Sequence, residues 1–124
     1  MRLLLDTHTA LWWMADDPRL SDRAGDELTR DGNVVLLSAV VAWEVAVKRA
    51  LGKLRAGHDI WERLAEAGAA SLAISIEHAQ AVEHLPPHHR DPFDRLLVAQ
   101  ASVERAVLVS RDDVLQRYDV PVIW

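Results

Sequence analysis

The chain has 124 residues, half of them hydrophobic, and a formal net charge of −5. We expect one domain, residues 1–124, because this length is sufficient to bury a core. The absence of cysteine excludes disulfides, thiolate metal sites and cysteine nucleophiles. No apolar run is long enough to span a bilayer, and the N-terminus does not have the pattern of a signal peptide. These features predict a soluble cytoplasmic protein with no membrane partner.

Strand and helix patterns alternate along the chain. In order, they are strand 2–6, helix 9–15, helix 22–30, strand 34–38, helix 40–51, helix 60–68, strand 72–76, helix 77–84, helix 92–104, strand 107–109, short helix 113–117 and strand 122–124. The alternation predicts an α/β fold with a central parallel sheet flanked by helices. The leucines at 3–5 are typical of a strand covered on both faces.

Acidic residues recur beside these strands. Asp6 and Asp112 each follow a strand, Glu44 lies in the helix after the second strand, and Asp94 opens the helix at 92–104. The carboxyl ends of parallel strands and the helix starts beside them share one edge, so we expect the four carboxylates to meet there. Their mutual repulsion requires a multiply charged cation among them. The pattern therefore predicts a divalent-metal site with oxygen ligands, which indicates phosphate chemistry.

Helix capping explains some of the same residues. Asp6 has the position of an N-cap, and Glu44 has the spacing of a helical surface pair with Lys48. The run Asp91-Pro92-Phe93-Asp94 is a typical helix start, in which Asp91 is the cap and both carboxylates favour the helix terminus.

In each of the pairs Asp91 and Asp94, and Asp112 and Asp113, one residue is expected to cap a helix and the other to belong to the metal site. We favour Asp94 over Asp91 for the site, because Asp94 leads into the helix face expected to pack on the sheet. In the second pair we expect Asp113 to cap the last short helix, which leaves Asp112 free to face the site.

Other motifs limit the chemistry further. His88 and His89 are adjacent and are expected to point apart, so a zinc site is not predicted. His8, near Asp6, either contacts a phosphate or is a partly exposed residue at the start of a helix. No glycine-rich phosphate loop is present, which excludes P-loop chemistry.

The net negative charge argues against a protein that coats nucleic acid, although bound cations would reverse the local sign. Basic residues that can still form local patches are Lys48, Arg49, Lys53, Arg55, Arg90, Arg95, Arg111 and Arg117.

Taken together, four blocks resemble the PIN-domain ribonucleases, specifically the VapC-type toxins of type II toxin–antitoxin pairs. The blocks are LLLDTHTALWW, AVVAWEVAVKRALGKL, HHRDPFDRLLVAQA and VLVSRDD, and they span essentially the whole chain in order. The resemblance implies a central parallel sheet, an acidic pocket holding Mg²⁺ or Mn²⁺, and cleavage of RNA. It also implies a small antitoxin partner and homodimerisation.

The resemblance also implies roles for individual residues. Asp6, Glu44, Asp94 and Asp112 match the family's acidic quartet, as catalytic and metal-binding residues. The supporting positions are Thr7, Ser110, Asp91 and Asp113, of which the first two match hydroxyls that steady the carboxylates. Basic residues expected at the rim, to hold the RNA backbone, are Arg90, Arg95 and Arg111.

Other functions remain as alternatives. One is a PIN-type RNA-processing nuclease that is not a toxin. Another is a non-catalytic partner-binding module with an apolar groove lined by Trp12, Trp13, Trp43 and Trp61, although aromatics at helical spacing are more often core. A receiver-type signalling domain needs a late lysine, and none follows Lys53; a haloacid-dehalogenase phosphatase needs aspartate at position 8, where His8 stands.

Overall fold

Five parallel strands form the centre of the molecule, in the spatial order β3-β2-β1-β4-β5. In the computed structural model, which describes residues 1–124, they are β1 (Arg2–Leu5), β2 (Val34–Ser38), β3 (Ala70–Leu72), β4 (Val107–Val109) and β5 (Val122–Ile123). Leu4 of β1 pairs with Leu36 on one side and with Leu108 on the other. The predicted α/β fold with a central parallel sheet is confirmed.

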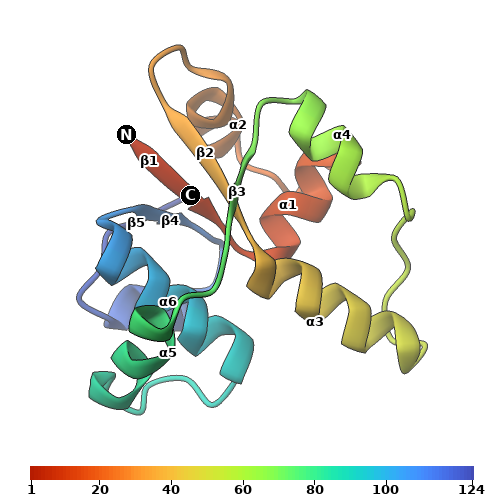
Figure 1. The fold of residues 1–124 in the computed structure, drawn as a ribbon. Coiled ribbons are helices and arrows are strands. Elements are labelled where there is room, and N and C mark those ends of the chain that lie inside the picture. The colour runs from red at the N-terminus through yellow and green to blue at the C-terminus, as the bar shows by residue number, and fades with distance from the viewer.

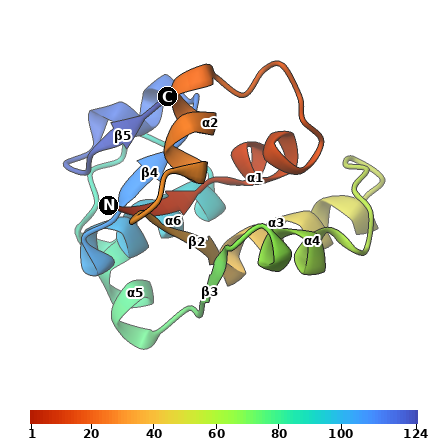
Figure 2. The ribbon, with the colours of Figure 1, turned by 90° about the horizontal axis from the view of Figure 1, so that it is seen from above.

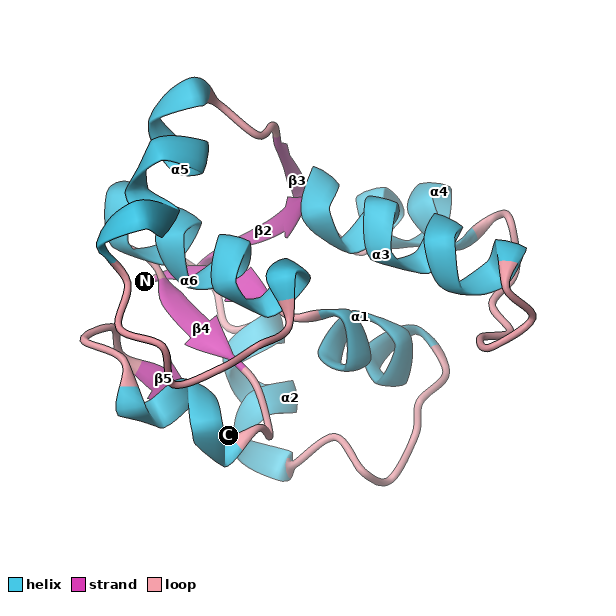
Figure 3. Ribbon diagram, turned by 90° about the horizontal axis from the view of Figure 1, so that it is seen from below, coloured by secondary structure: helices cyan, strands magenta, loops and turns pink.

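Helices surround this sheet (Figure 1). They are α1 (Thr7–Met14), α2 (Asp22–Thr29), α3 (Ala39–Ala50), α4 (Ile60–Glu66), α5 (Ile76–Ala81) and α6 (Pro92–Glu104), with two 3-10 turns, η1 (Val82–His84) and η2 (Asp113–Arg117). Figures 1 to 3 agree that α1, α3 and α4 gather at one end of the molecule, while α5 and α6 lie on the opposite side. None of these helices combines the length and apolar character needed to cross a bilayer.

The hydrophobic core is centred on β1. Leu3, Leu4 and Leu5 are fully buried, as expected for the middle strand of a parallel sheet that is covered on both faces. Leu97 of α6 and Val41 of α3 are also fully buried and belong to the same cluster. The helices that supply the acidic residues are therefore held against the sheet by apolar packing.

A buried polar network also holds α6 in place. The Gln100 side chain accepts a hydrogen bond from the Ser38 hydroxyl at 2.5 Å and donates to the carbonyl of Ala73 at 3.3 Å. Its amide nitrogen lies 3.2 Å from Nδ1 of the buried His78, whose Nε2 is 2.9 Å from Glu104. These contacts connect the second half of α6 to the end of β2 and to α5.

Several predicted elements have different bounds, and helix caps explain two of the differences. The strand predicted at 72–76 is wrong beyond residue 72, because Ser75 starts α5 with a reciprocal capping pair to His78. The helix predicted at 9–15 begins two residues earlier, at Thr7, because the Asp6 side chain accepts the backbone N–H of Thr9.

The core predicts a large effect of truncating the central strand. Leu4→Ala should lower the free energy of unfolding by about 2–5 kcal/mol, since a fully buried leucine leaves a cavity. Urea denaturation followed by circular dichroism measures this. The control, Leu51→Ala, removes a side chain that is 61% exposed and should change stability by less than about 0.5 kcal/mol. Equal losses in both variants would contradict this account of the core.

Candidate active site

The acidic site forms where the order of the strands reverses. β1 lies between β2 and β4, so the chain leaves β1 toward one half of the sheet and later fills the other half. Ligand sites in open α/β sheets form outside the carboxyl ends of the strands at such a point. Asp6 follows β1 directly, and Asp112 comes three residues after β4.

One hollow of about 210 Å³ at this edge, called the acidic pocket below, brings the four predicted acids together. Its only apolar lining residue is Trp12. The complete lining is Asp6, Thr7, His8, Trp12, Glu44, Lys48, His89, Asp91, Asp94, Arg111 and Asp112. The pocket thus contains five carboxylates, and the predicted quartet is among them.

Asp6 caps a helix and also faces the pocket. It is 8% exposed; one carboxylate oxygen accepts the backbone N–H of Thr9, and the other accepts the Ser110 hydroxyl at 2.5 Å. Ser110 is fully buried and its oxygen also accepts the backbone N–H of Asp112. A single hydroxyl between β4 and η2 therefore orients both strand-end acids, although Ser110 itself does not line the pocket.

Glu44 enters the pocket from the first half of α3. It is 5% exposed, and one oxygen accepts the Thr7 hydroxyl at 2.6 Å while the other is paired with Lys48. The pairing with Glu44 raises the pKa of the Lys48 ammonium. The sequence spacing suggested an exposed helical pair, but the structure places this pair in the wall of the pocket.

The N-terminus of α6 contributes Asp91 and Asp94. Asp91 is the N-cap and accepts the backbone N–H groups of Phe93 and Asp94, as predicted. The pKa of Asp94 is raised to about 7, first because burial disfavours the charged carboxylate and then because the Asp91 carboxylate repels it. Glu44 and Asp6 raise it further, and only His89 opposes them. Burial and the neighbouring carboxylates therefore leave Asp94 partly protonated at neutral pH when no cation is present.

The expected division between Asp112 and Asp113 needs correction. Asp112, and not Asp113, is the N-cap of η2, since its Oδ1 accepts the backbone N–H of Val114 at 2.9 Å. Its Oδ2 still faces the pocket, so capping and pocket lining are not exclusive. Asp113 is exposed and does not line the pocket.

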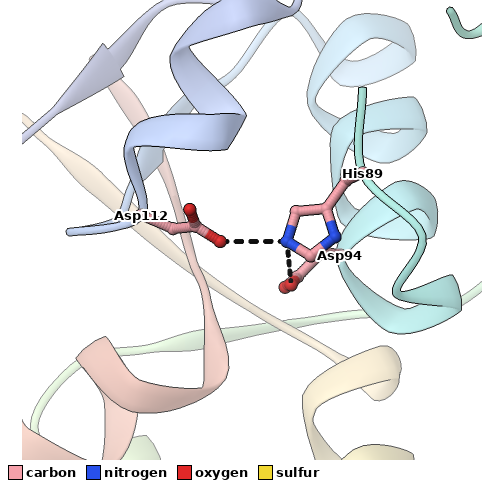
Figure 4. Close-up of side chains that lie close together, drawn as sticks. All are labelled: His89, Asp94 and Asp112. Atoms are coloured by element: carbon pink, nitrogen blue, oxygen red, sulfur yellow. Dashed lines mark hydrogen bonds and ion pairs between the residues drawn. The ribbon is translucent and has the colours of Figure 1, made fainter. Parts of the chain in front are cut away.

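His89 is the site residue that sequence reasoning missed. Its Nε2 lies 3.1 Å from Asp94 and 3.0 Å from Asp112, so the ring bridges the two carboxylates (Figure 4). Its Nδ1 accepts the backbone N–H of Asp91, which assigns the neutral ring's proton to Nε2 as donor. A histidine in a loop that contacts acids far along the chain leaves no regular spacing in the sequence. The signal that the sequence offered for His89 was its position two residues before Asp91, the N-cap of α6.

The predicted rim arginines have three different environments. Arg111 lines the acidic pocket. Arg90 is exposed and does not line the pocket. Arg95 is turned to the protein, where its guanidinium donates to the carbonyl of Pro86 at 3.0 Å and to the Tyr118 hydroxyl at 3.3 Å. Arg95 therefore braces the loop before α6, and its side chain is not available at the rim.

The donor set fits a hard divalent cation. Ligand atoms of His89, Asp94 and Asp112 lie within 4.8 Å of one another, and Asp6 and Glu44 line the same small pocket. Carboxylate oxygens are the preferred ligands of Mg²⁺ and Mn²⁺, whereas a single imidazole without thiolates does not indicate structural zinc. The raised pKa of Asp94 agrees with this, because burial, and then the neighbouring carboxylates, disfavour a negative charge that a cation would stabilise.

These features define the class of protein: a parallel α/β domain with an acidic pocket at its switch point. The chain belongs to the PIN-domain family, whose model matches residues 3–121. The predicted family is thus confirmed. Comparison with curated proteins finds no match.

Two of the solved structures with a similar fold are VapBC assemblies. One is VapBC2 from Rickettsia felis, solved with a DNA fragment from its promoter; the match has 16% identity and a TM-score of 0.74 and covers 99% of this chain and 98% of that one. The other is VapBC-1 from nontypeable Haemophilus influenzae, with 15% identity, a TM-score of 0.65 and coverage of 99% and 97%. At these identities the likeness demonstrates a shared fold.

The raised pKa of Asp94 predicts how stability depends on pH in the metal-free protein. Between the unfolded pKa of 3.8 and the folded pKa of about 7, the folded state binds more protons than the unfolded state. Stability should therefore fall as pH rises from about 4 to 7, by on the order of 2 kcal/mol after allowance for screening by water. Urea denaturation in EDTA across this range measures the slope.

The matching variant is Asp94→Asn, which removes the ionisable group. It should flatten this part of the pH profile and stabilise the metal-free protein at pH 7.5, whereas Asp26→Asn on the exposed side of α2 should leave the slope unchanged. A wild-type stability that increases between pH 4 and 7 in EDTA would contradict the raised pKa of Asp94.

Proposed function

We propose that this chain is the toxin subunit of a type II toxin–antitoxin pair and acts as an endoribonuclease that depends on Mg²⁺ or Mn²⁺. The observation that carries the proposal is the convergence of Asp6, Glu44, Asp94 and Asp112 in one small pocket at the switch point of a PIN-domain fold. The similarity in fold to chains of two VapBC assemblies supports the toxin assignment.

The proposed ligands of the cation are Asp6, Asp94 and Asp112, with Glu44 acting through water. When bound, the ion supplies charge neutralisation at the phosphate and lowers the pKa of water for in-line attack on the phosphodiester. Ser110 and Thr7 act as positioning residues, because their hydroxyls fix the carboxylates of Asp6 and Glu44.

Lys48 and Arg111 are the cationic side chains that line the pocket. Lys48 neutralises Glu44 and so limits the repulsion that Glu44 exerts on the other acids. Arg111, which is exposed and makes no hydrogen bond within the chain, is suited to hold a phosphate oxygen at the rim. The guanidinium of Arg95 is held by backbone carbonyls, so Arg95 is not among the proposed substrate contacts.

We infer two further partners from the family resemblance: an antitoxin that covers the pocket, and a second copy of the chain in a homodimer. A cytoplasmic location follows from an RNA substrate inside the cell. The toxin assignment is tested by the neighbouring reading frame. A short adjacent gene for a DNA-binding protein, whose co-expression relieves growth arrest caused by this chain, is the expected result. Growth that is unaffected by the chain alone would refute it.

Asp6→Asn tests the catalytic pocket directly. Cleavage of mixed transcripts in Mg²⁺ should fall to the EDTA background, because the variant loses a charged ligand and retains the cap of α1. Gel analysis of the RNA measures cleavage, and circular dichroism checks the fold. Asp113→Asn, next to the pocket but exposed, is the matched control and should cleave normally. Full activity of Asp6→Asn would refute the assignment.

Ser110→Ala tests the positioning role. Loss of the hydroxyl frees one oxygen of Asp6 and one backbone N–H of Asp112, so affinity for Mn²⁺ should fall by about 10–100-fold. Isothermal titration calorimetry with Mn²⁺ measures the change. Ser102→Ala, an exposed serine on α6, should bind Mn²⁺ as the wild type does. Unchanged affinity in Ser110→Ala would remove the hydroxyl from the proposal.

A further inference from the structure

A second hollow adjoins the acidic pocket and is called the basic groove below. It has a volume of about 450 Å³ and lies between α1, the turn after it and the connection from α3 to α4. Figure 2 shows α1 and this connection at the same end of the molecule. His8 and Trp12 line both the basic groove and the acidic pocket, so the two hollows adjoin at these side chains.

The basic groove carries positive charge in a chain whose net charge is negative. Its ionisable lining, apart from His8, consists of the four cations Arg19, Lys53, Arg55 and Arg63 and the single carboxylate Asp17. Arg19 pairs with Asp17 through two nitrogens, and Arg63 donates to the carbonyl of Met14.

Lys53 and Arg55 differ from these neighbours. Their side chains are exposed and make no hydrogen bond or ion pair within the chain. Arg49, on α3, shows the contrast, because its guanidinium is held by the carbonyls of Ala56 and Gly57. The exposed charges of Lys53 and Arg55 are thus available to a ligand, and neither is needed to hold the loop.

Aromatic and guanidinium groups are stacked where the two hollows meet. The ring of Trp12 lies 5.4 Å from the His8 ring, with Arg19 4.9 Å and Arg111 6.0 Å from its centroid. Proteins that bind single-stranded nucleic acid combine cations along the backbone with aromatic rings or guanidinium planes against which bases stack. The junction has both components, and it lies beside the carboxylates.

We propose that the basic groove is the path by which single-stranded RNA enters the acidic pocket. This inference rests on the proposed function. Lys53 and Arg55 contact successive phosphates, and a base next to the scissile phosphate stacks at the His8 and Trp12 junction. The observations favour RNA over a protein partner, because the exposed and unpaired ionic side chains of the groove are cations and because the groove adjoins the pocket where a phosphodiester must lie.

The test is RNA binding by a charge-reversed groove. The double substitution Lys53→Glu with Arg55→Glu is made in the Asp6→Asn background, which blocks cleavage on the proposed function. The control, Arg23→Glu with Arg105→Glu, makes the same change in net charge at exposed arginines of α2 and the far end of α6. Fluorescence anisotropy with a labelled mixed-sequence oligoribonucleotide of about 20 nucleotides gives the affinity at several salt concentrations.

The groove variant should bind at least about tenfold more weakly than the control, and the slope of log affinity against log salt should become shallower by about 1.4, as two lost phosphate contacts require. In the same assay, His8→Ala should weaken binding by about 5- to 100-fold with the salt slope unchanged, because stacking is not ionic. His8→Phe should restore most of the affinity.

The outcomes separate the two proposals. If the wild type cleaves RNA in Mg²⁺ and Asp6→Asn does not, but the groove variant binds like the control, the basic groove is overturned and the proposed function stands. If the groove variant binds RNA normally, and the same double substitution in the chain that keeps Asp6 is no longer silenced by a co-expressed antitoxin, the groove belongs to a protein partner and the proposal is also overturned. If the wild type cleaves no RNA with either metal, the proposed function itself fails.

Discussion

Repulsion among carboxylates at the carboxyl-terminal edge of the sheet is the constraint on which the rest of this structure depends. Five carboxylates line a hollow of about 210 Å³, and most of their oxygens are already committed to a donor. Backbone N–H groups, two hydroxyls, Lys48 and His89 supply these donors. Asp94 is compensated least, and burial, followed by repulsion from Asp91 and the other carboxylates, raises its pKa to about 7.

The same donors explain why capping and site roles coincide. Asp6, Asp91 and Asp112 each cap the helix or turn that follows them, so helix formation itself brings these carboxylates to the edge of the sheet. One oxygen of Asp6 and one of Asp112 accept the capping N–H, and the other oxygen of each side chain is directed elsewhere. Capping is therefore the means by which the fold holds like charges close together, and it is compatible with cation binding.

Negative and positive side chains gather in two adjoining hollows of the molecule. The acidic pocket lies at the switch point, and the basic groove begins one helical turn along α1, at the side chains of His8 and Trp12. A polyanion can bind the free cations of the groove while its reacting phosphate reaches the acidic pocket. A bound cation is needed there, because the carboxylates would otherwise repel the phosphate. On the proposed function, this arrangement lets a chain with a net charge of −5 bind RNA.

Local pattern in the sequence was sufficient for the alternation of elements, the parallel sheet, the Asp91 cap and the four acids that meet, because strand ends in such sheets share one edge. Tertiary structure alone decided the partners of each side chain. His89 reaches Asp112 across 23 positions, Ser110 reaches Asp6 across 104, and Arg95 turns from the rim to the carbonyls of its own loop. Periodicity and spacing describe neighbours along the chain, whereas these contacts depend on how α6 and the loop before it are placed against β4, which only packing of the core determines.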